Sequence, residues 1–178
     1  MARKLRRAPK VAIRVYEDEF YHQPGTLPGT IIIDADAPPP IIFLIDYNQT
    51  NFTREQIVTP EECVPYLEME SISWVDVQGL GSQDILQRLG KVFKLHSLVL
   101  EDIVNVPERP KTEDYEDQLL FISRMVVPKE RICGFHSEQV SLILGKNYLL
   151  TVQEEPEHDC FEGVRSRIEK NKGIIRKQ

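Results

Sequence analysis

EQVSLILGKNYLLTV, residues 138–152 of the chain, alternates large apolar side chains with smaller or polar ones on both sides of a Gly-Lys-Asn turn. Alternation with a period of two is typical of strands that have one face on a core. A short turn containing glycine joins antiparallel neighbours. The stretch therefore predicts two antiparallel strands, at 140–144 and 148–152, joined by a hairpin turn at 145–147.

Further strands are predicted on the N-terminal side of this hairpin. Residues 119–127 are nearly all apolar, which is typical of a central strand that is covered on both faces. Shorter apolar segments predict additional strands at 11–16, 30–33, 41–46 and 73–77.

Helices are predicted between and after these strands. The clearest covers 82–94, where apolar side chains form one stripe and Ser82 is placed to cap the first turn. A second helix is expected over 97–104, with Ser97 as its cap. Because strands and helices alternate early while strands follow one another late, we expect an α/β fold: a mixed sheet with helices on both faces.

The last predicted helix follows Asp159, which resembles an N-cap because Glu162 lies three residues on, as in a capping box. Its apolar side is expected to carry Phe161, Val164 and Ile168. The opposite side carries a basic cluster: Arg165, Arg167, Lys170 and Lys172.

Length and composition indicate one soluble globular domain. The chain has 178 residues, 41% of them apolar. Its longest purely apolar run, Ile41–Ile45, is far shorter than the about 20 residues that a membrane-spanning helix needs. No secretory signal is recognisable, and the three widely spaced cysteines favour a reducing cytosol over a disulfide framework.

Charge is distributed unevenly along the chain. Residues 1–14 hold six basic side chains and no acid, and residues 165–178 hold six basic side chains and one acid. The region between them holds 10 basic and 27 acidic side chains, a net charge of −17. Such a body disfavours nucleic acid and favours cationic partners, although acidity that only serves solubility is the plainer interpretation.

One helical segment could carry chemistry. In the helix predicted over 97–104, Glu101, Asp102 and the following Asn105 fall within about 100° of the helix surface, and positions 98–100, 103 and 104 are apolar. Hard cations such as Mg²⁺ take oxygen ligands, often one or two carboxylates with retained waters. The alternative is the solvated stripe of an ordinary amphipathic helix. No phosphate loop, nucleophile elbow or zinc-protease motif is present, so the sequence does not indicate an enzyme.

Three ordered blocks of the chain resemble the CorA family of divalent-cation channels. The first is LVLEDIVN at 98–105 with Arg-Pro-Lys at 109–111. The second is the EQVSLIL segment with Val-Gln-Glu at 152–154, and the third is 165–177. Leu-Pro-Gly-Thr at 27–30 is a weaker similarity.

The resemblance implies an αβα sandwich around a mixed β-sheet with an antiparallel C-terminal hairpin. The composition of residues 1–10 predicts a disordered basic arm. The resemblance implies that the cytoplasmic domain covers 11–160 and that a helix at 161–178 leads to a stalk. The stalk and the transmembrane helices would follow outside this sequence. The full protein would be a homopentamer at the cytoplasmic face of the inner membrane, with no enzymatic activity and no nucleic-acid partner.

The family's regulatory metal site falls on Asp102, with Glu101 beside it. The ion would be Mg²⁺, with Co²⁺ or Ni²⁺ as further ions, and a second carboxylate would come from the stalk of a neighbouring subunit. Alternatives are the cytoplasmic domain of a zinc-transporting relative, a soluble scaffold domain without metal sensing, and a soluble enzyme that shares the fold.

Overall fold

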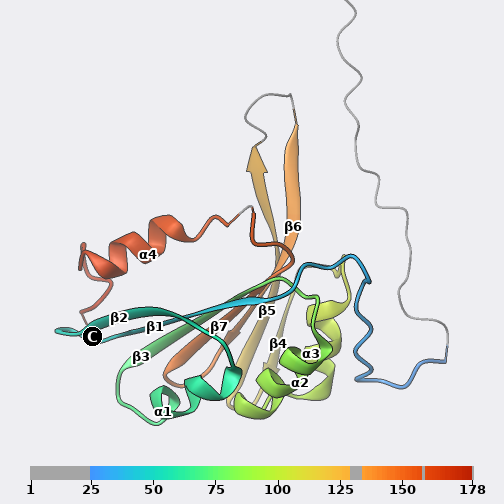
Figure 1. The fold of residues 1–178 in the computed structure, drawn as a ribbon, viewed down its shortest axis with the longest axis horizontal. Helices are drawn as coiled ribbons and strands as arrows, with labels where there is room; N and C mark the ends of the chain where they lie inside the picture. The colour runs from blue at the N-terminus through green and yellow to red at the C-terminus, as the bar shows by residue number, and fades with distance from the viewer. Residues whose placement is uncertain (1–24, 129–133, 158, 178) are drawn as a thin grey trace, which may run out of the picture.

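The structure, a computed structural model, describes residues 25–128, 134–157 and 159–177. Its centre is a seven-stranded mixed sheet with the strand order β2-β1-β3-β7-β6-β5-β4 (Figure 1). The strands are β1 (Ile41–Tyr47), β2 (Phe52–Ile57), β3 (Ile72–Gln78), β4 (Lys111–Tyr115), β5 (Gln118–Pro128), β6 (Phe135–Leu144) and β7 (Tyr148–Gln153).

The predicted C-terminal hairpin is confirmed at the middle of this sheet. Strands β6 and β7 pair antiparallel, with Leu144 opposite Leu149 next to the turn. β3 pairs with β7 in parallel, and every other neighbouring pair of strands is antiparallel. The hairpin therefore joins an antiparallel half of the sheet, β4 to β7, to the half built from β1 to β3.

Helices lie on both faces, as expected for an α/β sandwich. α1, α2 and α3 lie against one face and α4 lies over the other (Figure 1). Because side chains of a strand alternate between faces, Leu44 and Val75 enter the core under α2 and α3, whereas Ile45 and Trp74 enter the smaller core under α4. The helices are η1 (Pro60–Cys63), α1 (Val64–Leu67), α2 (Gln83–Val92), α3 (Ser97–Val104) and α4 (Glu162–Glu169).

Two strands were not predicted, and one predicted strand is absent. β2 and β4 have largely polar sequences because they are the edge strands of the sheet, and apolar patterning does not reveal them. Residues 30–33 form no strand; Ile31 and Ile33 cover the main core from an extended loop without a ladder partner. The predictions for 1–10 and 11–16 lie outside the described residues.

The last helix differs from its prediction in three ways. α4 begins at Glu162, and Asp159 accepts a hydrogen bond from the Phe161 backbone N–H at 3.0 Å, ahead of the N-cap. The helix ends at Glu169 and is followed by turns at 170–171 and 173–176, in which Asn171 and Gly173 take positive φ. Arg165, expected on the solvated side, is only 1% exposed.

Candidate functional site

Helix α3 presents the residues that the sequence singles out. Its N-cap is His96 rather than Ser97: the His96 Nδ1 atom accepts a hydrogen bond from the Leu98 backbone N–H at 3.2 Å. Val99 and Ile103 are buried against the sheet. Glu101 and Asp102 lie outside this buried stripe, and both are partly buried.

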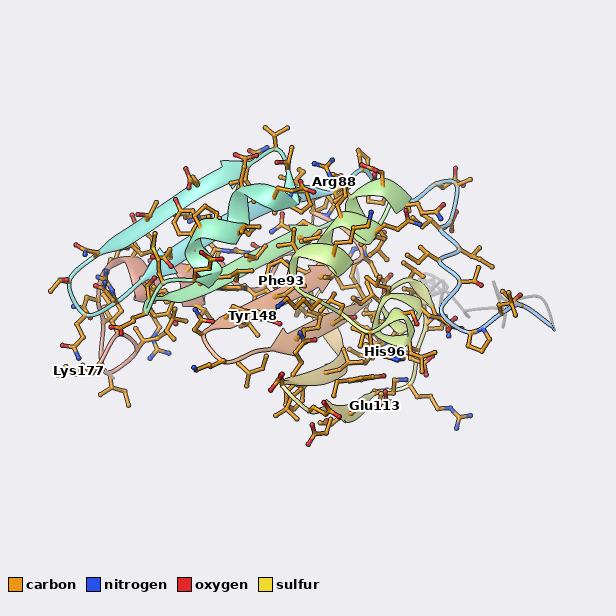
Figure 2. All side chains as sticks on the ribbon, turned by 90° about the horizontal axis from the view of Figure 1, so that it is seen from below. Arg88, Phe93, His96, Glu113, Tyr148 and Lys177 are labelled. Atoms are coloured by element: carbon orange, nitrogen blue, oxygen red, sulfur yellow. The ribbon has the colours of Figure 1, made fainter. Side chains whose placement is uncertain are left out.

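Asp102 is held by a cationic group of its own chain. The Lys111 ammonium lies 2.9 Å from Asp102 Oδ1 and 3.2 Å from Glu113 Oε1. The side chain of Asp102 is 15% exposed and that of Lys111 is 27% exposed. The two residues of β4 sit at the edge of the sheet, and Figure 2 shows Glu113 on the side of the domain away from Lys177.

The Asp102 carboxylate is partly withdrawn from solvent at this site. Burial raises the pKa of Asp102 above its usual value, and the hydrogen bond and charge of Lys111 offset only part of that effect. Burial also disfavours the charged form of Lys111, but its hydrogen bonds to Asp102 and Glu113 outweigh this and raise the pKa of the ammonium. The ammonium is thus firmly charged, while the Asp102 carboxylate gains less from the pair than it loses on burial.

Glu101 is directed elsewhere. Its Oε2 accepts a hydrogen bond from the Gly29 backbone N–H at 2.5 Å, which ties the Leu-Pro-Gly-Thr loop to α3. Gly29 has φ +82°, and a Cβ atom there would lie 2.7 Å from the Cβ of Ser97, so the contact requires glycine. The two neighbouring acids therefore bind different groups, and the structure does not bring them together on one ligand.

Gln139 fixes the position of the α3 C-terminus, a role that sequence analysis did not assign. Its Nε2 donates to the Asp102 backbone carbonyl at 3.0 Å, and its Oε1 accepts from the Glu108 backbone N–H at 2.8 Å. Asn105 donates to the Glu108 side chain at 2.8 Å. Gln139 is 2% exposed, and a buried amide needs partners, but this burial is visible only in the structure.

The described residues provide a single partly buried carboxylate at this site and not a complete set of metal ligands. Within the described ranges, no three His, Cys, Asp or Glu side chains are grouped so that they could hold a metal ion. Asp102 offers hard carboxylate oxygens, the kind that Mg²⁺ binds while keeping several waters. Among the described residues, α3 therefore offers one carboxylate of this kind, that of Asp102.

A second charged cluster lies under α4 on the opposite face of the sheet. The Arg165 guanidinium is 2.5 Å from Asp76 Oδ2 and also pairs with Asp159. Asp76, fully buried on β3, accepts further hydrogen bonds from Thr151 and Gln153 of β7. This cluster ties α4 to the centre of the sheet.

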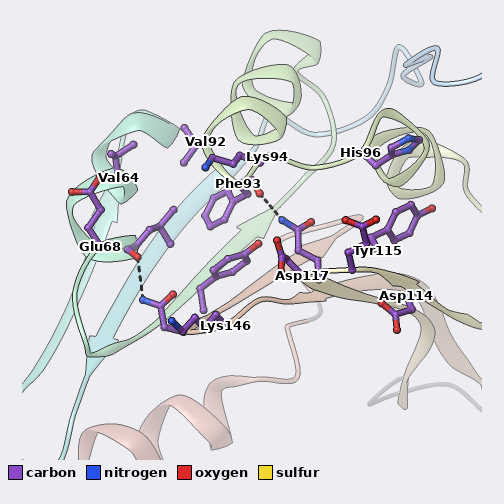
Figure 3. Close-up of a pocket in the computed structure, with 15 residues that line it drawn as sticks. Val64, Glu68, Val92, Phe93, Lys94, His96, Asp114, Tyr115, Asp117 and Lys146 are labelled. Atoms are coloured by element: carbon purple, nitrogen blue, oxygen red, sulfur yellow. Dashed lines mark hydrogen bonds between the residues drawn. The ribbon is translucent and has the colours of Figure 1, made fainter.

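A cleft opens beside α1 and the end of α2 (Figure 3). Phe93 and Tyr148 form its floor, with ring centroids 5.0 Å apart, and burial raises the pKa of Tyr148 to about 12. Its rim mixes charges of both signs, including Lys94 and Asp117. Neither Glu101 nor Asp102 lines it, so the cleft is separate from the carboxylates of α3.

The fold and the site together define a class: an α/β domain with a mixed sheet and a short carboxylate-bearing helix on one face. Among the described residues, no helix is long and apolar enough to span a bilayer. A family model described as CorA-like Mg²⁺ transporter protein matches residues 69–177. A relative named cobalt/magnesium transport protein CorA, from Thermotoga maritima, is 36% identical over 155 residues, 86% of this chain.

Solved structures agree on the fold. Full-length CmaX superimposes with a TM-score of 0.60 at 15% identity, covering 75% of this chain and 40% of that one. The complete CorA magnesium transporter of Methanocaldococcus jannaschii gives a TM-score of 0.53 at 18% identity, covering 74% and 38%. The chain belongs to the CorA-like Mg²⁺ transporter family. It spans 44% of the length of the Thermotoga relative.

Proposed function

We propose that this chain is the cytoplasmic Mg²⁺-sensing domain of a CorA-type divalent-cation channel, and that Asp102 is its sensing carboxylate. The observation that carries the proposal is the position of Asp102. It lies on α3, inside the matched residues 69–177, and it is a mostly buried carboxylate that already binds a cationic group. Co²⁺ and Ni²⁺, which also accept oxygen ligands, are the further ions proposed for it.

The domain boundaries follow from this proposal. Residues 11–160 form the sensing domain, and 161–178 lead to a stalk that continues into the membrane helices of the longer protein. Five subunits assemble, and a stalk of one places its carboxylate against α3 of the next. Asp102 presents its oxygens from the end of a helix that Gln139 holds in place. Glu101 adds a negative charge one residue away while it fixes the loop that contains Gly29.

The negative charge of residues 15–164 explains how the assembly would respond to Mg²⁺. Residues 15–164 carry a net charge of −17, so neighbouring domains repel one another. A divalent cation, when bound, supplies the positive charge that offsets this repulsion between subunits. Asp102 then helps hold adjacent domains together in the closed state, and the domains separate when cytosolic Mg²⁺ falls. The mechanism requires only that the closed state binds the ion more tightly than the open state.

The proposal is tested with the full-length protein in membranes. The Mg²⁺ concentration that half-protects the protein from chymotrypsin is measured for wild type, Asp102→Asn and the matched control Asp114→Asn. Asp114 is an exposed carboxylate on β4, and its substitution by asparagine removes the same charge as Asp102→Asn does. Repeating the titration with Co²⁺, Ni²⁺ and Zn²⁺ ranks the ions and separates a magnesium sensor from a zinc-transporting relative.

Wild type and Asp114→Asn are expected to become protected as Mg²⁺ rises. Asp102→Asn is expected to need at least about fivefold more Mg²⁺, because it loses the charged ligand. Equal midpoints for Asp102→Asn and wild type would remove Asp102 from the sensing site.

A further inference from the structure

We infer that Lys111 is a built-in competitor of the divalent cation at Asp102, and that Glu113 receives the Lys111 ammonium when the cation binds. This inference rests on the proposed sensing function of Asp102. It assigns to the same site an internal group that sets the ion concentration at which the sensor responds.

The geometry places one ammonium between two carboxylates. Lys111 is the first residue of β4 and Glu113 lies two residues on, so both side chains leave the same face of the strand. The Lys111 Nζ atom is 2.9 Å from Asp102 Oδ1 on α3 and 3.2 Å from Glu113 Oε1 on its own strand. A positive charge therefore already contacts Oδ1, one of the two oxygens with which Asp102 could bind a cation.

Electrostatics forbid both cations from keeping this position. A divalent ion on the Asp102 carboxylate would face the ammonium at a few ångströms, and like charges at that distance repel strongly where water is partly excluded. Lysine carries its charge on a flexible four-carbon stem with rotatable donors, so it can leave one partner without disturbing the backbone. Arginine, with its planar fork, exchanges partners less readily.

Glu113 lowers the free-energy cost of moving the Lys111 ammonium away from Asp102. Its carboxylate already contacts the ammonium, and hydrogen bonds from Tyr115 and Lys111 lower the pKa of Glu113, so it remains charged. Lys111 can release Asp102 and keep an ion pair on β4. The ammonium then remains neutralised in both states, and only Asp102 changes its partner.

A fixed ion pair that only fastens α3 to β4 is the alternative. The two interpretations differ in the sign of the effect on ion binding. If Lys111 competes, removing its charge makes Asp102 easier to occupy. If it only fastens α3, removing it loosens the site and weakens ion binding.

The test uses the full-length protein and the Mg²⁺ midpoint for protection from chymotrypsin, a protease that does not cleave at lysine. The variants are Lys111→Gln, Lys111→Arg and Glu113→Gln. Lys146→Gln, an exposed lysine on the β6–β7 turn, controls for loss of one positive charge. Asp114→Asn, beside Glu113 on the exposed side of β4, controls for loss of one negative charge. Thermal melts of each variant verify folding, and Lys111→Met replaces the glutamine variant if that one is unstable.

The expected result is a pair of opposite shifts. Lys111→Gln lowers the Mg²⁺ midpoint at least about fivefold, whereas Glu113→Gln raises it at least about twofold because the ammonium is left with Asp102 alone. Lys111→Arg does not lower the midpoint, and the controls at Lys146 and Asp114 stay within about twofold of wild type.

The failures of the two proposals can be told apart. If wild type responds to Mg²⁺, Asp102→Asn does not, and Lys111→Gln matches wild type or needs more Mg²⁺, the competition is wrong and the sensing function stands. A shift in Lys146→Gln as large as that in Lys111→Gln also overturns the competition, because the effect is then one of general charge. If wild type and Asp102→Asn respond alike, the sensing function fails, and the competition fails with it.

Discussion

Two ion-pair clusters on opposite faces of the same sheet show how differently a charge can be used. Under α4, Arg165 is 1% exposed and lies between Asp76 and Asp159. Beside α3, Lys111 is 27% exposed and lies between Asp102 and Glu113. The first cluster is closed by further hydrogen bonds to Asp76, whereas the second lies at an edge strand. A fully buried pair must stay intact, but a pair at the rim can exchange its cation.

The largest expected effect is on the closed cluster. Arg165→Ala leaves the Asp76 carboxylate, which is 0% exposed, without its cation, and this is expected to lower the free energy of unfolding by about 3–5 kcal/mol. Urea denaturation measures it. Arg167→Ala, at an exposed position of the same helix, is expected to cost under about 0.5 kcal/mol. Equal losses of free energy of unfolding in the two variants would show that burial of the Arg165–Asp76 pair does not determine its contribution to stability.

The next effect depends on pH and concerns Glu138, on the α4 side of β6. Burial raises the pKa of Glu138 to about 7, and the charges of Glu154, Glu155 and Asp159 add to this effect. Because the folded-state pKa lies above the unfolded one, the folded state binds the proton more tightly. The stability that Glu138 contributes is therefore present below about pH 4.5 and is lost as the pH rises through about 7.

Glu138→Gln should remove this dependence. At pH 8 the free energy of unfolding of the variant is expected to be about 2–3 kcal/mol higher than that of wild type. This difference should shrink as the pH falls toward 5. Urea denaturation at a series of pH values measures it, with the exposed Glu70→Gln as control. A difference that does not change with pH would contradict the assignment.

A smaller effect is expected at Gln139, which connects the rim cluster to the sheet. Gln139→Met keeps the volume but leaves the Asp102 carbonyl and the Glu108 N–H without this partner, at a cost of about 1–2 kcal/mol. Hydrogen exchange of the Glu108 amide should become faster. Gln56→Met, on the exposed edge strand β2, should change neither quantity. An unaltered exchange rate at Glu108 would mean that Gln139 does not fix α3.

The smallest effect on stability is expected at the rim itself. Lys111→Gln should change the free energy of unfolding by less than about 1 kcal/mol, because a partly exposed pair gains little beyond what its burial costs. The same variant is expected to shift the Mg²⁺ midpoint strongly, so stability and ion response separate at this residue. A loss of free energy of unfolding comparable to that of Arg165→Ala would show that the two clusters contribute alike to stability.

Sequence reasoning succeeded where local pattern decides the structure. The hairpin at 138–152 and the helices at α2 and α3 follow from alternation and from a single apolar stripe. It failed at β2 and β4, because edge strands are polar and are recognisable only by their neighbours. It also failed at Arg165: the helical wheel placed this residue with other basic side chains, but its partner Asp76 lies 89 residues away in the chain.

The candidate site was predicted only in part. The positions of Glu101 and Asp102 on one short helix followed from spacing and resemblance. Their partners, Gly29 and Lys111, did not, because both contacts join segments that come together only in the folded domain. The internal ion pair of Asp102 could not be deduced from a helical wheel, which represents one helix without its surroundings.

Anomalous diffraction from crystals of the full-length protein soaked with Co²⁺ tests the central claim most directly. An anomalous peak is expected at the Asp102 carboxylate, with the Lys111 ammonium withdrawn from Asp102 and in contact with Glu113. Peaks found only elsewhere, with the Lys111 Nζ atom still at 2.9 Å from Asp102 Oδ1, would contradict it.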